Sequence, residues 1–428
     1  MTRSYLLLLS LTGNLVAFDP PSDYEERILK DTSAASFTPP GRLVKQYTRN
    51  GKTFEIWAGS LLDLQVRQTV ERMQVLISFF IEAGTPLNTN DADWTLDRWH
   101  AYFVYETRFS SSNALNVSHS FLGYATTYRF FTFPPRYQST GPSERAFSLD
   151  NAPPVLTGDI SPIALPSRLR ISQFLILPPY QSSGHGSTLY STIYEDALVD
   201  KNVHELTVED PSEEFDVLRD INDWKILEPC FLEADVMVNT KLIESLEKKR
   251  SMRLPTAKLL DMERVRSIRA RKKIAPRQFL RQLEMYLLSR IPFSHRAAGG
   301  ANLTKLLVQK SKAANSDDRV YYWWRLLVKQ RIFKKNRDVL AQADIGEKHQ
   351  HVDAAFRGQE DEYEKLLLLF ATSRAKQDLA QGQGDGVSSA GIFSQQRKRK
   401  VVADDDDLEG ESDDAVATRH EAKQARSA

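Results

Sequence analysis

The sequence predicts an α+β fold, in which a mixed, mainly antiparallel sheet is flanked by helices and followed by a C-terminal helical bundle. Two observations support this prediction. Between residues 37 and 208, short runs of branched and aromatic residues alternate with turn signals and helix-compatible segments. Beyond Trp224 the composition changes to helix formers with many cations, interrupted by Pro255, Pro276 and Gly299-Gly300.

The first predicted elements are a hairpin and an amphipathic helix. Residues 37–57 predict a hairpin with Asn50-Gly51 as its turn, because this dipeptide favours the tight turns that join antiparallel strands. Residues 61–82 predict one helix with apolar residues on one face and Gly84 as its stop. Residues 101–109 and 118–133 are rich in strand formers, so we expect an antiparallel pair that leads into the central strand.

A strand, a glycine turn and a helix follow one another between residues 170 and 190. Residues 171–177 have the pattern of a buried strand, and Pro178 and Pro179 end it because neither can donate to a ladder. The turn Gln-Ser-Ser-Gly-His-Gly comes next, and a helix-compatible segment begins at Ser187. Glycines let the backbone approach an anion closely, and the unpaired amides at a helix N-terminus point toward it.

The residues of this turn exclude two common phosphate loops. A P-loop needs Gly-Lys-Ser/Thr, and no lysine lies between Gly184 and Asp200. A dinucleotide fingerprint needs a third glycine three residues after Gly186, where the sequence has Leu189. A glycine turn that only starts a helix stays open as the alternative to an anion site.

A second strand-to-helix junction lies a short way along the chain. Residues 203–208 predict a strand, and Asp210 is a good N-cap for the helix that follows. Pro211 suits the first helical position, and Glu213 would complete a capping box. Asp210 therefore has a structural explanation, whereas Glu209, at the end of the strand, has none.

The two junctions resemble one known family. They contain the stretches RISQFLILPPYQ, GHG and TVEDPSEEFDVLRD, which are similar to the type B histone acetyltransferase catalytic subunit of the GNAT superfamily of N-acetyltransferases. The resemblance covers about residues 37–376 and implies a GNAT-type sheet whose central strand pair splays apart around acetyl-CoA. It also implies direct acetyl transfer to tail lysines of free, newly made histone H4, which is presented with its partner histone. A WD-repeat histone chaperone subunit is the further implied partner, with nucleus and cytoplasm as the location.

The resemblance also assigns residues to the acetyl-CoA site. The backbone of Phe174, Leu175 and Ile176 would contact the pantetheine and acetyl portion. Ser212 would contact the cofactor from the next loop, unless it is a plain first-turn helix residue. The residues that would hold the pyrophosphate are Gln181, Ser182, Ser183, Gly184, His185, Gly186 and Ser187. We expect acetyl-CoA as the co-substrate and no metal.

The catalytic assignment depends on how the substrate lysine loses its proton. An acceptor lysine has a pKa near 10.4, so its free amine costs about 4.6 kcal/mol at pH 7, and a nearby carboxylate can take the proton. Glu209 is the expected general base, with Asp210 as the neighbouring candidate. By the same resemblance, Glu82 matches a second acidic residue near the substrate lysine, and an exposed helix-end carboxylate is the equal alternative. The resemblance also matches a substrate-contact position to a triplet that could be ordinary strand, Tyr128, Arg129 and Phe130.

Composition divides the chain into segments. We expect an atypical N-terminal extension at 1–36, the acetyltransferase core at 37–228, a C-terminal helical domain at 229–376 and a disordered tail at 377–428. The extension is shorter than the N-terminal domain usual in the family. Its first 18 residues imitate a secretory signal but lack a clear cleavage site and are too short to span a bilayer. Residues 135–166, rich in Pro and Ser, predict a surface loop inserted in the core.

The C-terminal part contains features with more than one interpretation. The basic cluster of residues 264–273 is either a solvated helix face or a surface for an acidic partner. Without an aromatic-interleaved groove beside it, we expect no direct nucleic-acid contact, and we expect no membrane contact. The aromatic residues 321–324 predict packing anchors. In the tail, residues 397–400 are all basic and resemble a nuclear import signal.

Charge and cysteine usage set the remaining limits. The 57 basic and 56 acidic residues give a net charge of +1, so no overall field favours a nucleic-acid partner. Cys230 is the only cysteine, which excludes an intramolecular disulfide and fits a reducing compartment. Its thiol leaves open a ping-pong enzyme with an acyl carrier, although inert packing is the simpler interpretation. The other alternative is a catalytically impaired chromatin scaffold, against which the intact glycine loop and Glu209 argue.

Overall fold

The computed structural model describes residues 37–110, 113–131, 165–240, 259–300, 302–303 and 309–382. The predicted N-terminal extension, the predicted insertion up to residue 164 and the chain after residue 382 lie outside the described residues. The first described strands are β1 (Arg42–Arg49) and β2 (Lys52–Ser60). They form the predicted hairpin, and its turn residues Asn50 and Gly51 both have positive φ, at 50° and 73°.

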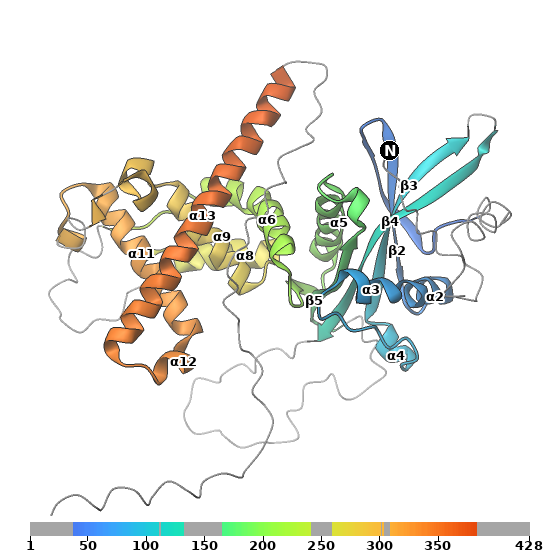
Figure 1. The fold of residues 1–428 in the computed structure, drawn as a ribbon, viewed down its shortest axis with the longest axis horizontal. Helices are drawn as coiled ribbons and strands as arrows, with labels where there is room; N and C mark the ends of the chain where they lie inside the picture. Colours follow the sequence, from blue (N-terminus) through green and yellow to red (C-terminus); the bar gives the residue numbers. More distant parts are fainter. Residues whose placement is uncertain are drawn as a thin grey trace, which may run out of the picture. The chain divides into compact units, whose positions relative to one another are not determined.

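One sheet contains all six described strands in sequence order (Figure 1). The hairpin is followed by β3 (Trp99–Ser110), β4 (Asn113–Phe131), β5 (Ser167–Ile176) and β6 (Val203–Val208). Every neighbouring pair is antiparallel except β5 and β6, which are parallel. The parallel pair requires a crossover, and α5 (His185–Val199) supplies it. The mixed, mainly antiparallel sheet with flanking helices confirms the predicted fold class.

Helices cover both faces of the sheet. On one face, α5 packs with alternate strand residues in a cluster that includes Ile56, Val104, Ile171 and Leu206. On the other face, a second cluster combines the buried residues of α2 (Leu64–Met73) and α3 (Val75–Phe80) with strand residues of the opposite parity. Because side chains alternate along a strand, each strand contributes to both clusters. A short helix, α4 (Asp93–Leu96), precedes β3.

The single helix predicted for residues 61–82 is two helices, and Gln74 separates them. Its backbone N–H bonds to the carbonyl of Glu71, a tighter contact than the α-helical one. Its side-chain amide donates to Val70 O and accepts from the backbone N–H of Leu87 at 2.7 Å. These bonds fold the segment after α3 back over the helix pair. Periodicity alone could not show the break, because the apolar face continues across it.

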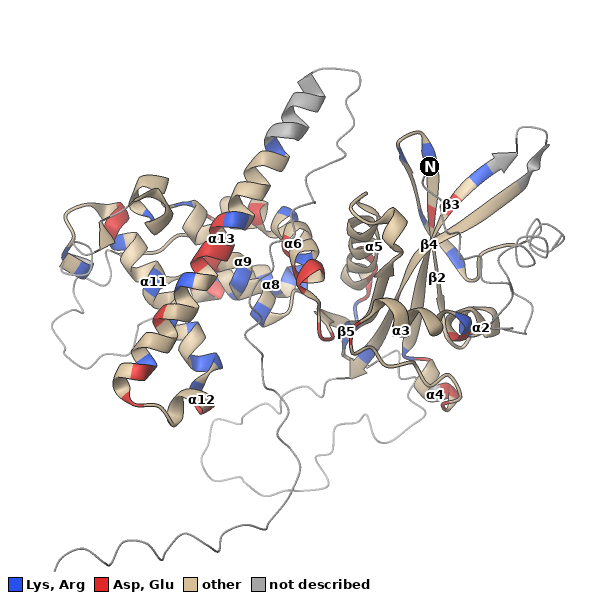
Figure 2. Ribbon diagram, in the orientation of Figure 1, with Lys and Arg blue, Asp and Glu red and all other residues tan. Residues whose placement is uncertain are grey.

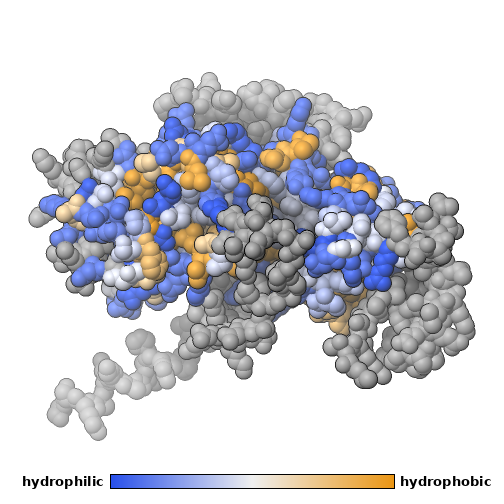
Figure 3. Space-filling model, turned by 90° about the horizontal axis from the view of Figure 1, so that it is seen from above, coloured by the Kyte–Doolittle hydropathy of each residue, from blue (hydrophilic) through white to orange (hydrophobic). Residues whose placement is uncertain are grey.

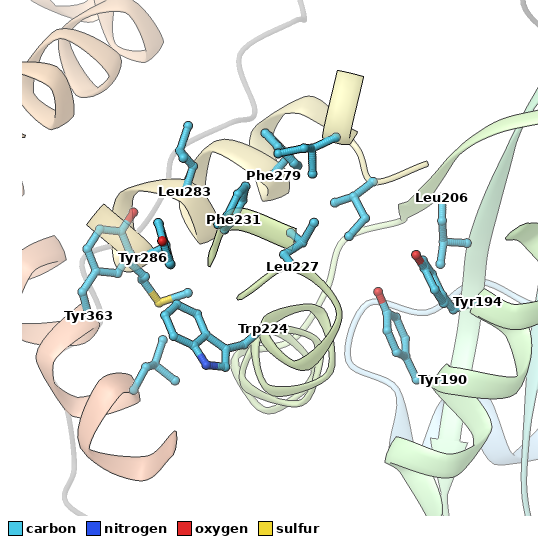
Figure 4. Close-up of a cluster of buried hydrophobic side chains, with 14 of the residues drawn as sticks. Tyr190, Tyr194, Leu206, Trp224, Leu227, Phe231, Phe279, Leu283, Tyr286 and Tyr363 are labelled. Carbon is cyan, nitrogen blue, oxygen red and sulfur yellow. The ribbon is translucent and has the colours of Figure 1, made fainter. Parts of the chain in front are cut away.

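The helix α6 (Glu213–Glu233) continues through the predicted domain boundary at 228/229. The later helices are α8 (Met262–Lys272), α9 (Pro276–Ser289), α11 (Ser316–Lys335), α12 (Arg337–Ala341) and α13 (Ile345–Gly382). One buried cluster contains residues of the sheet, α6 and these helices. Figure 4 shows Phe231 of α6 beside Phe279 and Tyr286 of α9, at ring-centroid distances of 5.5 and 5.1 Å. The last helix extends past the predicted 376/377 boundary.

A buried carboxylate connects α6 to the C-terminal helices. Asp220 is 1% exposed, and Arg281 of α9 donates to it from Nε at 2.9 Å and from Nη2 at 2.8 Å. Gln278 and Gln282 also donate to Asp220, each at 2.9 Å. The same guanidinium bonds Glu362 of α13 at 2.6 Å, so three helices meet at one ionic group. A buried carboxylate with this many donors has its desolvation compensated.

Two predictions about the C-terminal part have different outcomes. Tyr321 and Trp324 are fully buried, which confirms them as packing anchors. The predicted basic cluster is only partly a free helix face. Lys273 donates to the carbonyls of Ala197 and Leu198 at 3.0 and 2.9 Å, and so caps the C-terminal end of α5. Arg269 lies 3.6 Å from Glu205 of β6.

The described surface is mostly hydrophilic in the view of Figure 3, with several hydrophobic areas. The exposed apolar residues include Phe79 of α3, Val199 at the end of α5, and Val339, Ile345 and Leu368. Within the described ranges, no helix is both long and apolar enough to cross a membrane.

We predict that Asp220→Ala lowers the free energy of unfolding by about 3–5 kcal/mol, because it leaves buried donors of α9 without their acceptor. Urea unfolding monitored by circular dichroism measures the change. Asp216→Ala, one turn earlier on α6 and exposed, is the matched control and should change stability by less than about 1 kcal/mol. Equal stability of the two variants would show that Asp220 does not hold the helices together.

Candidate functional site

The site begins where β5 and β6 stop pairing. Their parallel ladder ends at Ile171 and Val208, with one further bond from the backbone N–H of Glu209 to Ile171 O at 2.9 Å. Strand β5 continues to Ile176 and is paired over that stretch with β4 only. The edge of β5 after Ile171 therefore has no partner strand. This is the splayed central pair that the resemblance implies.

A β-bulge marks the point where the strands part. Gln173 pairs with Thr126 and Ile171 with Thr127, so Ser172 is an extra residue on β5. Its hydroxyl donates to Oε2 of Glu209 at 2.8 Å. Bulges re-aim a side chain, and this one turns Ser172 toward the carboxylate at the end of β6. Glu209 is half-buried and its carboxylate is held in a defined position.

The backbone beyond the bulge has a defined direction. The N–H of Gln173 donates to Thr126 Oγ1, and the N–H of Leu177 donates to Leu122 O, both on the β4 side. Because backbone groups alternate along a strand, Phe174 and Ile176 direct theirs to the side without a strand. Leu175 directs its backbone to β4, since a Cβ on Gly123 would overlap the Leu175 carbonyl oxygen. Of the three residues predicted to contact pantetheine through the backbone, two face the open edge.

The predicted pyrophosphate loop lies at the N-terminal end of α5. Gln181 anchors it by donating from Nε2 to Ile176 O at 2.8 Å. The first hydrogen bond of the helix runs from Thr188 N to Gly184 O at 3.1 Å, which leaves the preceding amides free for an anion. Ser182 and Gly184 both have left-handed φ, at 56° and 80°. The loop thus has the geometry of an anion site.

Two glycines of this loop have side chains of other elements close to them. A Cβ on Gly184 would overlap the guanidinium of Arg49, which belongs to β1. A Cβ on Gly186 would lie 2.8 Å from Leu218 of α6 and 3.7 Å from the ring of Phe174. The loop is therefore packed between the hairpin, the open edge of β5 and α6. A side chain at either glycine would have to displace the end of a neighbouring side chain, Arg49 at Gly184 and Leu218 at Gly186.

Three other loop side chains are occupied by the protein itself. His185 is 4% exposed, and its Nδ1 lies 2.8 Å from the hydroxyl of Tyr47. Burial, and then the charge of Arg49, lower the pKa of His185, so its imidazole adds no positive charge to the loop near pH 7. The Ser187 hydroxyl accepts from Asn222 Nδ2 at 3.2 Å, and the Ser183 hydroxyl donates to Gln181 O at 3.2 Å. His185 and Ser187 can therefore offer a ligand chiefly their backbone N–H groups.

The predicted cap of α6 is wrong by two residues. The helix begins at Glu213, and Ser212 is the N-cap, whose hydroxyl accepts from Phe215 N at 3.3 Å. Asp210 is exposed and has a φ of 32°, in the left-handed region that aspartate tolerates. Ser212 was expected to contact the cofactor, and in the structure its hydroxyl caps α6. Asp210 lies next to Glu209 without a capping role.

The predicted substrate triplet is divided between the two faces of the sheet. Tyr128 accepts a hydrogen bond from Arg170 at 3.0 Å, and the Arg170 guanidinium lies 5.5 Å from the ring centre of Phe130. These residues share a face with Trp99, whose ring is 4.6 Å from that of Tyr128. Arg129 projects to the opposite face, where it forms an ion pair with Asp200 after α5. Tyr128 and Phe130 remain candidate substrate contacts.

Glu82 lies in the turn that follows α3, and it is exposed. Gln173 Nε2 donates to Thr85 O at 3.3 Å, which places this segment against β5 one residue after the bulge. Ile81 and Leu87, on either side, pack into the cluster beneath α2 and α3. Glu82 is thus on the α2–α3 side of the sheet, in the segment next to Ser172.

The ping-pong alternative does not fit the position of the thiol. Cys230 is near the C-terminal end of α6, and its Sγ donates to Ile226 O at 3.4 Å. At 1.5 Å per residue, it lies about 27 Å along the helix from Ser212. An acyl group on Cys230 would be remote from the loop and from Glu209. Within the described part of the chain, no group of three or more His, Cys, Asp or Glu residues could hold a metal ion.

Sequence reasoning missed two residues at this site. Ser172 gave no signal, because a serine within a strand pattern is ordinary and the bulge cannot be read from periodicity. Arg49 contacts the loop from β1, across a long separation in sequence. Its only local signal is its position directly before the Asn50-Gly51 turn. That position predicts a well-defined backbone for Arg49 but no contact with the glycine loop.

Comparison with known proteins identifies what the chain is similar to. The family model described as Histone acetyl transferase HAT1 N-terminus matches residues 9–82, a range that begins within the predicted extension. A histone acetyltransferase type B catalytic subunit from Aspergillus oryzae is 45% identical over 87% of this chain and 71% of its own length. Proteins of the same description from Aspergillus fumigatus and Neurospora crassa are 43% and 35% identical, over 94% and 95% of this chain and 72% and 80% of their own.

We predict that Ser212→Ala destabilises the protein by about 1 kcal/mol, because it removes the cap of α6. Asp210→Gly should leave stability unchanged or raise it slightly, because glycine adopts the left-handed backbone without strain. Thermal unfolding of both variants checks the assignment. A larger loss in the Asp210 variant would restore Asp210 as the cap.

Proposed function

We propose that this chain, which belongs to the family of histone acetyltransferase type B catalytic subunits, acetylates tail lysines of free histone H4 with Glu209 as the general base. It is an acetyl-transferring enzyme, and acetyl-CoA is the acetyl donor. The observation that carries the proposal is the place of Glu209. Its carboxylate is held by Ser172 where the edge of β5 becomes free.

The loop and the open edge fit acetyl-CoA. The free amides at the start of α5 suit a pyrophosphate, and Gly184 and Gly186 leave no side chain in its way. The backbone groups of Phe174 and the backbone N–H of Ile176 suit a pantetheine chain that takes the place of a missing strand, while the Ile176 carbonyl accepts from Gln181. The ring centroids of Phe174 and Phe215 are 4.9 Å apart, so α6 packs against the strand next to the free edge.

In the proposed reaction, Glu209 accepts the proton of the incoming lysine ammonium, directly or through a water. The free amine attacks the acetyl carbonyl, the thioester C–S bond breaks, and CoA leaves as a thiolate that takes up the second amine proton. The acetyl group passes to the lysine without a covalent enzyme intermediate. Deprotonation of the lysine ammonium at pH 7 costs about 4.6 kcal/mol of free energy, which the transfer of this proton to Glu209 offsets. Ser172 orients the carboxylate by donating to one oxygen, which leaves the other oxygen for the substrate.

The charge around Glu209 suits a basic peptide. Asp210, Glu213 and Glu214 are exposed next to it, and acidic residues gather in the first turn of α6 (Figure 2). On the α2–α3 side, Glu82 is also exposed. A histone tail rich in Lys and Arg would be attracted to this surface, chiefly at low ionic strength. The intact glycine loop and the positioned carboxylate of Glu209 argue against a scaffold without activity.

We predict that Glu209→Gln lowers turnover on an H4 tail peptide by roughly two to four orders of magnitude, the usual contribution of a positioned base. Acetyl-CoA should still bind, because the loop is unchanged. The remaining rate should rise with pH, as more of the substrate lysine is already neutral. Steady-state kinetics with acetyl-CoA and an H4 peptide, compared with the peptide whose lysines are replaced by arginine, measure these effects.

Three further variants, at Ser172, Asp210 and Glu82, separate the roles of neighbouring groups. Ser172→Ala should reduce kcat by roughly tenfold and leave KM for acetyl-CoA unchanged, because only the orientation of the carboxylate is lost. Asp210→Asn should keep most of the turnover. Near-normal turnover in Glu209→Gln, with a large loss in Asp210→Asn or Glu82→Gln, would transfer the base to the sensitive residue.

We also propose a WD-repeat histone chaperone as a partner and movement between cytoplasm and nucleus, both on the family resemblance and the basic run at 397–400. That run lies outside the described residues. Removal of residues 383–428 should keep activity on the H4 peptide and reduce nuclear accumulation of a fluorescent fusion. Normal nuclear entry of the shortened chain would remove the basic run as the import signal.

A further inference from the structure

Arg49 is the last residue of β1 and lies over the start of α5. Its Nη1 donates to the carbonyl of Ser183, and its Nη2 lies 3.4 Å from Thr188 Oγ1. The guanidinium also occupies the space beside Gly184 where a Cβ would project. Arg49 is therefore in contact with the predicted pyrophosphate loop, although it comes from the other end of the sheet.

The tip of the hairpin holds Arg49 in this place. Asn50 and Gly51 follow it with positive φ at both positions, the pattern of the tight turn that matches strand twist. Arg49 pairs with Lys52 across the turn, so its backbone is part of the ladder. The side chain is half-buried, and its guanidinium lies 6.0 Å from the ring centre of Tyr47. It is thus a positioned cation and not a free surface side chain.

The charge of Arg49 is not balanced by the protein. Lys45 of the same hairpin pairs with Glu195 at 3.0 Å, and Lys52 pairs with Glu106 at 3.1 Å. No carboxylate pairs with Arg49 among the residues that the structure describes. A guanidinium has five N–H donors, and the two contacts with the loop leave the others available.

This arrangement favours an external anion. Arg49 and the helix N-terminus both present positive charge to the same loop, a combination that stabilises an anion bound there. The planar fork of an arginine matches two phosphate oxygens at once. His185 lies beneath the loop, and its lowered pKa leaves the imidazole neutral near pH 7. It therefore adds no second side-chain cation to the loop.

We propose that Arg49 binds a phosphate group of acetyl-CoA and supplies the side-chain cation that the glycine loop itself lacks. The inference rests on the proposed function and extends it to the nucleotide end of the co-substrate. The hairpin thereby closes the phosphate site from the side opposite α6. Binding of acetyl-CoA should in turn make the hairpin tip more rigid.

Three ligands test the proposal on the full chain: acetyl-CoA, its analogue without the 3′-phosphate, and S-acetylpantetheine, which has no phosphate. Arg49→Met should weaken binding of acetyl-CoA by about 10- to 100-fold, the range expected for lost hydrogen bonds to a charged group. Binding or KM of S-acetylpantetheine should be unchanged. Arg49→Lys should recover part of the affinity, and the affinity of Arg49→Met should depend less on salt than that of the original chain.

Lys52→Met is the matched control, because it removes the same charge from the other side of the turn without a contact to the loop. It should change acetyl-CoA affinity by less than about twofold. A loss that is equal for acetyl-CoA and the analogue without the 3′-phosphate assigns Arg49 to the pyrophosphate, and a loss confined to acetyl-CoA assigns it to the 3′-phosphate. Both outcomes support the proposal.

Unchanged affinity of Arg49→Met for acetyl-CoA would overturn the proposal, and so would an equal loss for S-acetylpantetheine, which would indicate a general distortion. Thermal unfolding of each variant confirms that it is folded. If the original chain itself does not bind acetyl-CoA, the proposed function fails, and this result is distinct from a failure of Arg49 alone.

Discussion

The site depends on one constraint of the sheet: β5 and β6 pair only as far as Ile171 and Val208. Beyond that point, β6 passes directly into a loop and α6, whereas β5 continues to Ile176 before its own loop and α5. The free edge of β5, the loop at the start of α5 and the carboxylate of Glu209 therefore meet at one place. The bulge at Ser172 is at the same point and directs a hydroxyl to Glu209. A longer β6 ladder would cover the edge that acetyl-CoA is proposed to occupy.

Contacts between the helices support this arrangement. The close approach of Gly186 to Leu218 holds the start of α5 against α6, and Phe174 packs on Phe215 below the free edge. Further along α6, Asp220 joins it to α9 and α13. The helix whose N-terminus lies beside Glu209 is thus connected to the C-terminal helices through a buried ionic group. The C-terminal part and the site share one core.

The sequence by itself determined the features that depend on neighbouring residues. The Asn50-Gly51 hairpin, the strand before Pro178, the glycine loop and the strand before Glu209 all follow from local conformational preference. Their order was enough to predict the fold class and the family resemblance. Element ends were less predictable, since Gln74 divides one predicted helix and Ser212, not Asp210, caps another. In each case a side-chain hydrogen bond decides the boundary, and hydrophobic periodicity contains no information about it.

Only the tertiary structure decided which distant residues meet and which face they occupy. Ser172 reaches Glu209 because a one-residue bulge changes the register, and Arg49 reaches the glycine loop because the sheet brings β1 over the start of α5. Strand parity separates Arg129 from Tyr128 and Phe130, although the three are consecutive in sequence. The length of α6 removes Cys230 from the site. Register, parity and crossover depend on pairing between segments far apart in the chain, so local sequence patterns cannot specify them.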